Sequence, residues 1–421
     1  MKRILIGLSL LVGCVSWSAA RAQTLTLDAC RQEARDNYPA IRRYSLIEQS
    51  RDFTLSNAQK GWLPKVSATA GGFVFTDIVD VPAPMSAMTG DMKNHLLTAG
   101  VQVSQTLYDG GAIAAQRRVA RAQADVQREQ LNVLLYDIND RVQQLFFGIL
   151  TLDEQIRQNL LLQDDLQLSR KTVESMMRGG IANQTDVDAV SVQQVTARQQ
   201  EGTLRASRHA YLRMLGTFIG RELSDDTVLE RPVVSGASAY GAVQQNHRPE
   251  LAFYESQAHL LELQKRQFDS QLMPRLSAFG MGMYHSRMMS MLNNGMLAAG
   301  LTLNWNIGAL YTRKNDKAKL DVQRQDIESQ RETFLFNTRL QNENSNGIIR
   351  SLQQQIAQDD EIIRLRENIR SKSEKKVQLG TETVNEMLRD VNAVSEARQA
   401  KALHEILLLK EIYNLKNINN N

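Results

Sequence analysis

The hydrophobic residues between positions 131 and 156 follow a helical repeat. They recur at alternating intervals of four and three residues, and Gln, Asp, Arg and Asn fill most positions between them. The recurring residues are Leu131, Leu135, Ile138, Val142, Leu145, Ile149, Leu152 and Ile156. A heptad seam of this length predicts a long amphipathic helix that packs against other helices along its whole length.

Proline interrupts helices, and it is absent from residues 85–231 and from residues 275–421. Each of these stretches predicts two long helices joined by a tight turn. The first helix would be on the order of 100 Å long at about 1.5 Å per residue. The helices are expected over residues 111–178, 185–220 and 312–379 and from Gly380 to about 416, with turns near Gly180 and Gly380.

Two other segments alternate between apolar and small or polar residues. The clearest is residues 297–307, where Leu, Ala, Leu, Leu, Trp and Ile occupy every second position. This period of two predicts β-hairpins over about residues 65–109 and 274–307. Strands of about ten residues with this alternation are typical of transmembrane β-structure, although a surface sheet of a soluble domain would alternate too. The aromatic residues favoured at membrane interfaces stand at the strand ends, and they are Trp62, Tyr108 and Trp305.

Four strands limit how this β-structure can enter a membrane. An open sheet leaves its edge N–H and C=O groups unsatisfied in lipid, and a small closed barrel needs about eight strands. If the strands cross a membrane, several chains must therefore pool them. No stretch after the N-terminal segment offers the roughly 18 consecutive apolar residues that a spanning helix needs.

The order of these elements occurs twice along the chain. Residues 63–68 (Leu-Pro-Lys-Val-Ser-Ala) correspond to residues 273–278 (Met-Pro-Arg-Leu-Ser-Ala), and Pro39 corresponds to Pro249, both at an offset of 210. Further on, Gly180 and Gly380 correspond at an offset of 200. Each copy predicts a helix of about 35 residues, a β-hairpin and a long helical hairpin. We expect a first repeat over residues 23–220, a linker over 221–240 and a second repeat over 241–421.

Residues 1–22 have the features of a secretory signal peptide. Two basic residues precede an apolar stretch over residues 4–15, and residues 20–22 form an Ala-x-Ala cleavage site. A lipobox-like sequence ending at Cys14 leaves lipidation of that residue open. Removal of residues 1–22 takes away three basic residues and no acid, so the formal charge falls from +4 to +1 (50 − 3 = 47 basic against 46 acidic residues).

This small charge gives no reason to expect a nucleic-acid partner. Cys30 would be the remaining cysteine, and we expect it to be a small buried residue. The six histidines form no metal-binding spacing, and no catalytic triad, phosphate loop or paired carboxylates stand out. The sequence therefore predicts no enzyme, no cofactor and no metal site.

Several motifs in this order resemble the TolC family of outer-membrane efflux channels. They are an Asn-x-Pro motif at residues 37–39, the hairpin entry at 63–68, and the exit Leu-Tyr-Asp-Gly-Gly at 107–111. The turn motifs are residues 180–187 (Gly-Ile-Ala-Asn-Gln-Thr-Asp-Val) and residues 380–384 (Gly-Thr-Glu-Thr-Val) followed by Glu386. The resemblance covers nearly the whole chain after the signal peptide.

The resemblance implies a mostly α-helical fold with a small transmembrane β part. Three protomers would form a homotrimer with a 12-stranded β-barrel and an α-helical tunnel, located in the outer membrane of a Gram-negative bacterium and extending into the periplasm. The chain would serve as the exit duct of a tripartite efflux pump or a type I secretion system. Its partners would be outer-membrane lipid, a periplasmic adaptor (membrane fusion) protein and an inner-membrane transporter of the RND, ABC or MFS class.

The resemblance also places the periplasmic gate and the adaptor contacts at the two helical turns. The residues concerned are Gly180, Thr185, Asp186, Gly380, Thr381, Glu386 and Arg389. Arg389 departs from the family, in which an acid is common at this position, and this departure puts a purely cation-selective entrance in doubt. An i, i+3 ion pair between Arg389 and Glu386 is the alternative.

Methionine is concentrated in the two hairpin segments, which are predicted to reach the cell exterior. Nine of the fifteen methionines lie there: Met85, Met88, Met92, Met281, Met283, Met288, Met289, Met291 and Met296. Flexible apolar packing across the mouth of the barrel is the favoured interpretation. Thioethers are also soft ligands suited to Cu(I) or Ag(I), so a soft metal leaving the channel is the second hypothesis.

Two other classes of protein fit part of the pattern. A periplasmic coiled-coil adaptor contains a helical hairpin, and a structural scaffold or filament contains long heptad helices. Neither class accounts for two copies that each carry a pair of strands, and heptads alone do not exclude either one.

Overall fold

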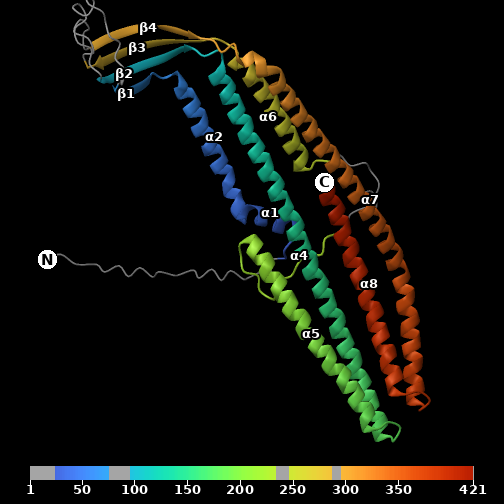
Figure 1. Cartoon of the computed structure of the whole chain (residues 1–421). Helices are drawn as coiled ribbons and strands as arrows, with labels where there is room; N and C mark the ends of the chain where they lie inside the picture. Colours follow the sequence, from blue (N-terminus) through green and yellow to red (C-terminus); the bar gives the residue numbers. More distant parts are fainter. Residues whose placement is uncertain (1–23, 75–94, 234–245, 287–294, 421) are drawn as a thin grey trace, which may run out of the picture. The chain divides into compact units, whose positions relative to one another are not determined.

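The computed structural model describes residues 24–74, 95–233, 246–286 and 295–420 (Figure 1). The predicted signal peptide and Cys14 lie outside these residues. The helices are α1 (Leu27–Asn37), α2 (Arg43–Gln59), α4 (Ala112–Arg178), α5 (Gln184–Ile219), α6 (Pro249–Gln271), α7 (Ala309–Gln378) and α8 (Val384–Asn419). The strands are β1 (Lys65–Val74), β2 (His95–Tyr108), β3 (Arg275–His285) and β4 (Gly295–Asn304), and short 3-10 segments occur at Pro39–Arg42 and Lys60–Trp62.

These elements confirm the predicted fold class of long helical hairpins with a small β part. Helix α4 has 67 residues and α7 has 70, and each is followed by a return helix of 36 residues. Their bounds lie within a few residues of those expected from the heptad pattern and the glycines. Among the described residues, no helix is apolar enough over a sufficient length to cross a membrane.

The prediction of one helix of about 35 residues at the start of each repeat is wrong. In the first repeat it is divided into α1, a 3-10 segment and α2, and in the second repeat α6 has 23 residues. Tyr38 precedes Pro39 and is extended (φ −64°, ψ 129°), and Arg248 precedes Pro249 with φ −62° and ψ 138°. The ring of a proline disfavours the helical conformation of the residue before it, so each of these prolines begins a new helical segment.

The chain divides into two compact units, and each unit draws residues from both halves of the sequence. Unit 1 comprises residues 1–38, 138–243 and 344–417, and unit 2 comprises residues 39–137, 244–343 and 418–421. Helices α4 and α7 contribute residues to both units. The two units are described separately below.

Unit 1 is helical, and the heptad seam of α4 forms part of its core. Val142 and Ile149 are fully buried, and the Phe147 ring lies 5.8 Å from that of Tyr413 in α8. Helix α1 buries Cys30 completely, as expected. Asn37 at the end of α1 donates hydrogen bonds from Nδ2 to the carbonyl oxygens of Thr217 and Phe218 at 3.2 and 3.0 Å. These carbonyls belong to the last turn of α5, which has no helical partners for them.

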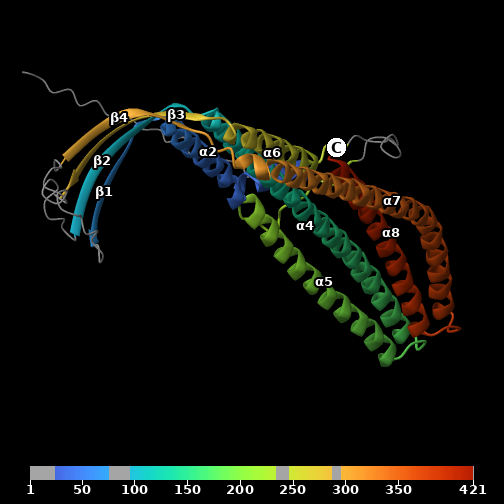
Figure 2. The same cartoon turned by 45° about the horizontal axis from the view of Figure 1, so that its top comes forward.

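Unit 2 contains a four-stranded antiparallel sheet in the order β1-β2-β3-β4 (Figures 1 and 2). The β1–β2 ladder is continuous from Lys65 to Val74 against Ser104 to His95, whereas the β2–β3 ladder shifts register between Thr106 and Tyr108. Side chains alternate between the two faces of a strand, so one face of β4 carries Leu297, Leu301 and Leu303, all exposed. Close to the sheet, α4 packs on α6 through a small cluster of Ala122, Val126 and Leu260.

Candidate functional site

The turn between α4 and α5 is held by two backbone hydrogen bonds that close the end of α4. The amide of Ile181 donates to the carbonyl of Met176 at 2.9 Å, and the amide of Gly180 donates to that of Met177 at 3.1 Å. This pair of bonds is the Schellman motif, which requires a left-handed residue. Gly180 supplies it with φ 72°.

The turn between α7 and α8 has the same construction 200 residues later. The amide of Thr381 donates to the carbonyl of Lys376 at 2.9 Å, the amide of Gly380 donates to that of Val377 at 2.9 Å, and Gly380 has φ 74°. The hydroxyl of Thr381 adds a hydrogen bond to the Lys376 carbonyl at 3.1 Å. Both turns lie in unit 1, and both glycines are exposed.

Each return helix begins with a capping box, in which two residues satisfy each other's backbone amides. In α5, the Asp186 amide donates to Asn183 Oδ1 at 3.2 Å and the Asn183 amide donates to Asp186 Oδ2 at 3.0 Å. In α8, the Glu386 amide donates to Thr383 Oγ1 at 3.3 Å and the Thr383 amide donates to Glu386 Oε2 at 2.9 Å. Thr185, also proposed from the sequence, is exposed in the first turn of α5.

The carboxylate of Glu386 is used in this cap and not in the expected ion pair. It accepts hydrogen bonds from both the amide and the hydroxyl of Thr383, each at 2.9 Å. The backbone hydrogen bond from Thr383 is the main reason that the pKa of Glu386 lies below its ordinary value, and nearby Arg389 adds a smaller electrostatic contribution. No ion pair joins Glu386 to Arg389 in the described part of the chain, and Arg389 is exposed beside the turn.

An apolar cluster next to the turns packs the two helical hairpins together. It contains residues from all four long helices of unit 1, including Val173 of α4, Val190 of α5, Val377 of α7 and Val391 of α8. Val173, Val190 and Val391 are fully buried. Burial on this scale contributes roughly 1.5–3 kcal/mol per side chain, so the two turns are held beside one another.

A charged network beyond this cluster was not predicted from the sequence. Asp165 of α4 lies 2.8 Å from Arg370 of α7 and 3.5 Å from Arg398 of α8. Arg370 also pairs with Glu374 at 2.8 Å, and Arg398 pairs with Glu367 at 2.6 Å. One carboxylate on the first hairpin is thereby linked to two guanidinium groups on the second.

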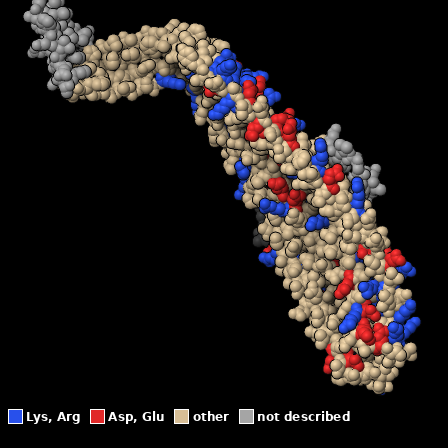
Figure 3. All heavy atoms as spheres, turned by 45° about the vertical axis from the view of Figure 1, so that its right-hand side comes forward, with Lys and Arg blue, Asp and Glu red and all other residues tan. Residues whose placement is uncertain are grey.

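The three aromatic residues assigned to a membrane interface lie at one end of the sheet. The ladders place Lys65 opposite Ser104 and Arg275 opposite Asn304, so Trp62 before β1, Tyr108 at the end of β2 and Trp305 after β4 share this end. All three are exposed, and the Trp305 indole donates to the Leu272 carbonyl at 2.9 Å. On the face shown in Figure 3, charged side chains lie over the helices and the sheet carries few.

The nine hairpin methionines fall into two groups. Met85, Met88, Met92, Met288, Met289 and Met291 lie outside the described residues. Met281 and Met283 belong to β3 and Met296 belongs to β4, so these three lie in strands and not in loops.

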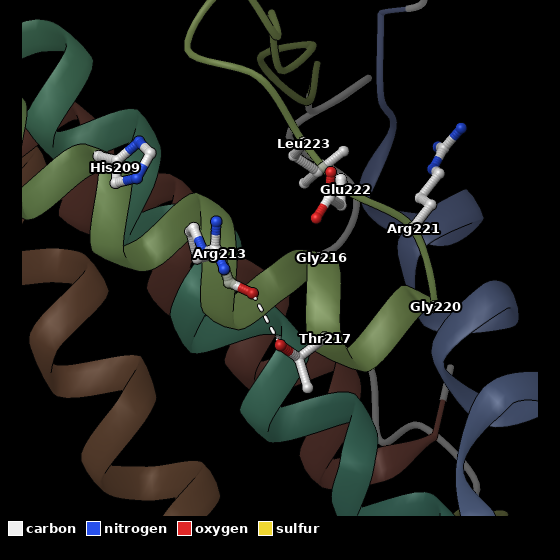
Figure 4. A pocket seen from close by; sticks show the side chains of 8 residues that line it. All are labelled: His209, Arg213, Gly216, Thr217, Gly220, Arg221, Glu222 and Leu223. Atoms are coloured by element: carbon white, nitrogen blue, oxygen red, sulfur yellow. Dashed lines mark hydrogen bonds between the residues drawn. The ribbon is translucent and has the colours of Figure 1, made fainter.

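A cavity of about 310 Å³ lies at the end of α5 in unit 1 (Figure 4). His209, Arg213, Gly220 and Glu222 are among the residues that line it. His209 Nδ1 lies 3.0 Å from Asp225, and the Thr217 hydroxyl donates to the Arg213 carbonyl at 2.9 Å. Among the described residues, no group of three or more His, Cys, Asp or Glu side chains could hold a metal ion, and the cavity presents no nucleophile paired with a base.

Comparison with known proteins agrees with this architecture. The chain matches the solved outer-membrane channel OprN with 15% identity and a TM-score of 0.67, covering 93% of this chain and 89% of that one. It matches VceC of Vibrio cholerae with 12% identity and a TM-score of 0.66 (93% and 95% covered). It matches the CmeC channel of Campylobacter jejuni with 11% identity and a TM-score of 0.64 (99% and 93% covered). No curated protein sequence matches the chain.

The chain therefore shares the fold of these solved outer-membrane channels over more than nine-tenths of its length. Residues 30–221, a little less than half of the chain, match the family model of outer membrane efflux proteins. This match and the shared fold favour an outer-membrane efflux protein over the adaptor or scaffold considered as alternatives. The family is one of transport proteins and not an enzyme family.

Proposed function

We propose that three copies of the chain form a passive exit duct for small molecules or polypeptides. The observation that carries the proposal is the open sheet. Strands β1 and β4 are the edges in the described part of the chain, and Leu297 on the apolar face is 90% exposed. Unpaired edges and an exposed apolar face are both unfavourable in an isolated protomer. Closure with strands of other copies, in lipid, removes both costs.

In this proposal the two sequence repeats, 23–220 and 241–421 with a linker at 221–240, are copies of one structural unit. The repeated geometry of the turns supports the duplication, because both end in a left-handed glycine and a capping box. Six equivalent helical hairpins from three protomers would then surround the duct. The chain would depend on a periplasmic adaptor and an inner-membrane RND, ABC or MFS transporter for energy.

The proposed gate lies at the two turns, where an adaptor would also make contact. Gly180 and Gly380 shape the turns, and Thr185 and Thr381 are exposed on them. Asp186 and Glu386 have fixed carboxylates because both belong to capping boxes. Arg389 forms no ion pair with any described residue, so it would place a positive charge beside Glu386 that no partner fixes. Trp62, Tyr108 and Trp305 would lie at the lipid interface.

Single-channel conductance of the detergent-purified protein in a planar bilayer tests this proposal. We expect discrete conductance steps whose preference for cations falls in Glu386→Ala and rises in Arg389→Asp. Glu396→Ala is the matched control, because Glu396 is also an exposed acid of α8 but lies away from the turn. A protein that is soluble without detergent and gives no conductance in any variant would refute the duct. Equal changes in Glu386→Ala and Glu396→Ala would refute the location of the gate.

A further inference from the structure

Strand β3 carries a line of soft side chains on one face. Met281, Met283 and His285 occupy alternate positions of the strand, so their side chains leave the same face. In the ladder with β4, Met283 is the partner of Met296. Directly opposed residues of an antiparallel pair have Cβ atoms about 4.5–5.5 Å apart, and this distance is within the reach of two thioether side chains.

This face of the sheet is the polar one. The register places Gln102 opposite Met281, and Thr98 opposite His285. Residues of β4 with the same parity as Met296 include Thr302 and Asn304. The leucines of β4 lie on the other face. The thioethers are therefore on the face that would line the proposed duct, away from lipid.

The sheet leaves room beside these thioethers. Thr69, Gly100, Met283 and Met296 form one row across the four strands. Gly100 contributes no side chain, and a Cβ atom there would lie 3.7 Å from the Met283 Cβ and 3.2 Å from the Gly282 carbonyl oxygen. Met296 remains 45% exposed, so this methionine fills no gap in a packed core.

The donor set is soft and uncharged. Three thioethers suit Cu(I) or Ag(I), whereas Ca²⁺ and Mg²⁺ prefer carboxylate and carbonyl oxygens. None of the four strands contains Asp or Glu. We propose that Met281, Met283 and Met296 form a site on the polar face of the sheet for a soft monovalent metal ion, Cu(I) or Ag(I).

The inference rests on the proposed function in one respect. The site can bind metal ions during export only if the polar face lines the duct. Binding itself requires only the sheet. From sequence alone the methionines were interpreted mainly as flexible loop packing, because the period of two did not show which of them lie on one face. The ladder shows that Met283 and Met296 are directly opposed. The proposed metal ligands are therefore methionines of the strands and not of the loops.

The test is isothermal titration of silver(I) into the detergent-purified chain, with Cys30→Ala as the background so that no thiol contributes. The strand variant is Met281→Leu, Met283→Leu and Met296→Leu, which removes three sulfur atoms at nearly constant volume. The matched control replaces three other hairpin methionines, Met288→Leu, Met289→Leu and Met291→Leu.

We expect the strand variant to lose at least about tenfold in silver affinity, a free-energy change of about 1.4 kcal/mol, while the control retains the affinity of the background protein. His285→Ala is expected to leave the silver affinity unchanged, because His285 lies four residues from Met281 on an extended strand, about 13 Å away at about 3.3 Å per residue. Absence of silver binding by the background protein overturns the site. Equal affinity of the strand variant and the background, or an equal or greater loss in the control, also overturns it. Conductance of the same variants reports on the duct separately, because leucine at these positions leaves the sheet and its pore intact.

Discussion

Asp165 is the residue at which one substitution should loosen the contact between the two helical hairpins of unit 1. Its carboxylate is the shared partner of Arg370 and Arg398, which belong to two different helices. The substitution Asp165→Asn keeps the shape and one hydrogen-bond acceptor but removes the charge. Arg370 and Arg398 then retain only Glu374 and Glu367, so this charged link between the hairpins is lost while both ion pairs within the second hairpin remain.

The expected loss of free energy depends on how far the Asp165–Arg370 ion pair is shielded from water. The side chains of Arg370 and Asp165 are 13% and 23% exposed. Breaking a fully buried pair costs about 3–5 kcal/mol, whereas exposed pairs contribute about 0–1 kcal/mol. A partly shielded pair therefore corresponds to about 2 kcal/mol. Because every 1.4 kcal/mol is a factor of ten, this loss corresponds to roughly 30-fold more frequent local opening.

Hydrogen–deuterium exchange measures this opening directly. We expect peptides covering residues 163–170 and 366–374 to exchange about 30-fold faster in Asp165→Asn, with no change in peptides of the sheet. Glu361→Gln is the control, because the Glu361–Arg364 pair at 3.4 Å has side chains that are 68% and 73% exposed, and its loss should change little. Unchanged exchange at residues 366–374 in Asp165→Asn would show that the apolar cluster alone holds the hairpins together.

Four further outcomes follow from the same geometry. Asn37→Ala removes the donor to two carbonyls at the end of α5, and we expect a loss of about 1 kcal/mol, seen as a lower thermal unfolding temperature. Gly380→Ala forces alanine into φ 74° and should cost about 1–2 kcal/mol, whereas Gly202→Ala, in a helix with no atom near the added methyl, should stabilise. Burial raises the pKa of the Cys30 thiol to about 11, so a thiol reagent at pH 8 should modify it only after unfolding. Hydrogen bonds lower the pKa of Glu386 below 4.5, so its cap stabilises α8 above pH 4.5 and is lost as the pH falls through the lowered pKa. Amide exchange at the start of α8 should show this pH dependence, and Glu386→Gln should abolish it.

The sequence predicts those features that depend on local periodicity. The heptad pattern predicts helix α4, and the long stretches without proline predict the other long helices. Gly180 predicts the first turn, because a left-handed residue is required wherever a helix reverses in this way. The alternation of apolar and polar residues predicts the strands. The break at Pro39 was readable in principle, since the residue before a proline avoids the helical conformation.

The features that escaped prediction depend on which faces meet. Asp165 stands among several charged residues of α4, and nothing in its neighbours distinguishes it from a solvated acid. Its partner Arg370 lies 205 positions later, so the pair exists only because α4 and α7 pack at one particular register. In the same way, the alignment of Met283 with Met296 depends on the length of the connection between β3 and β4, which alternation does not specify.

The duplication shows how the two hairpins have diverged. Arg170 and Glu174 form an i, i+4 pair at 2.8 Å, and Arg370 and Glu374 form the equivalent pair at 2.8 Å. The repeats differ at Asp165, because the corresponding residue of the second repeat is Leu365, which is 49% exposed.

In the proposed trimer, each hairpin meets an equivalent neighbour on both sides. The contact within a protomer then contains a carboxylate between two arginines, whereas the corresponding contact between protomers presents a leucine. Salt weakens the first contact and leaves apolar contacts intact. The six interfaces of such a ring would therefore not loosen together. At high ionic strength the charged contact within each protomer should weaken, while the apolar cluster that also joins its two hairpins remains.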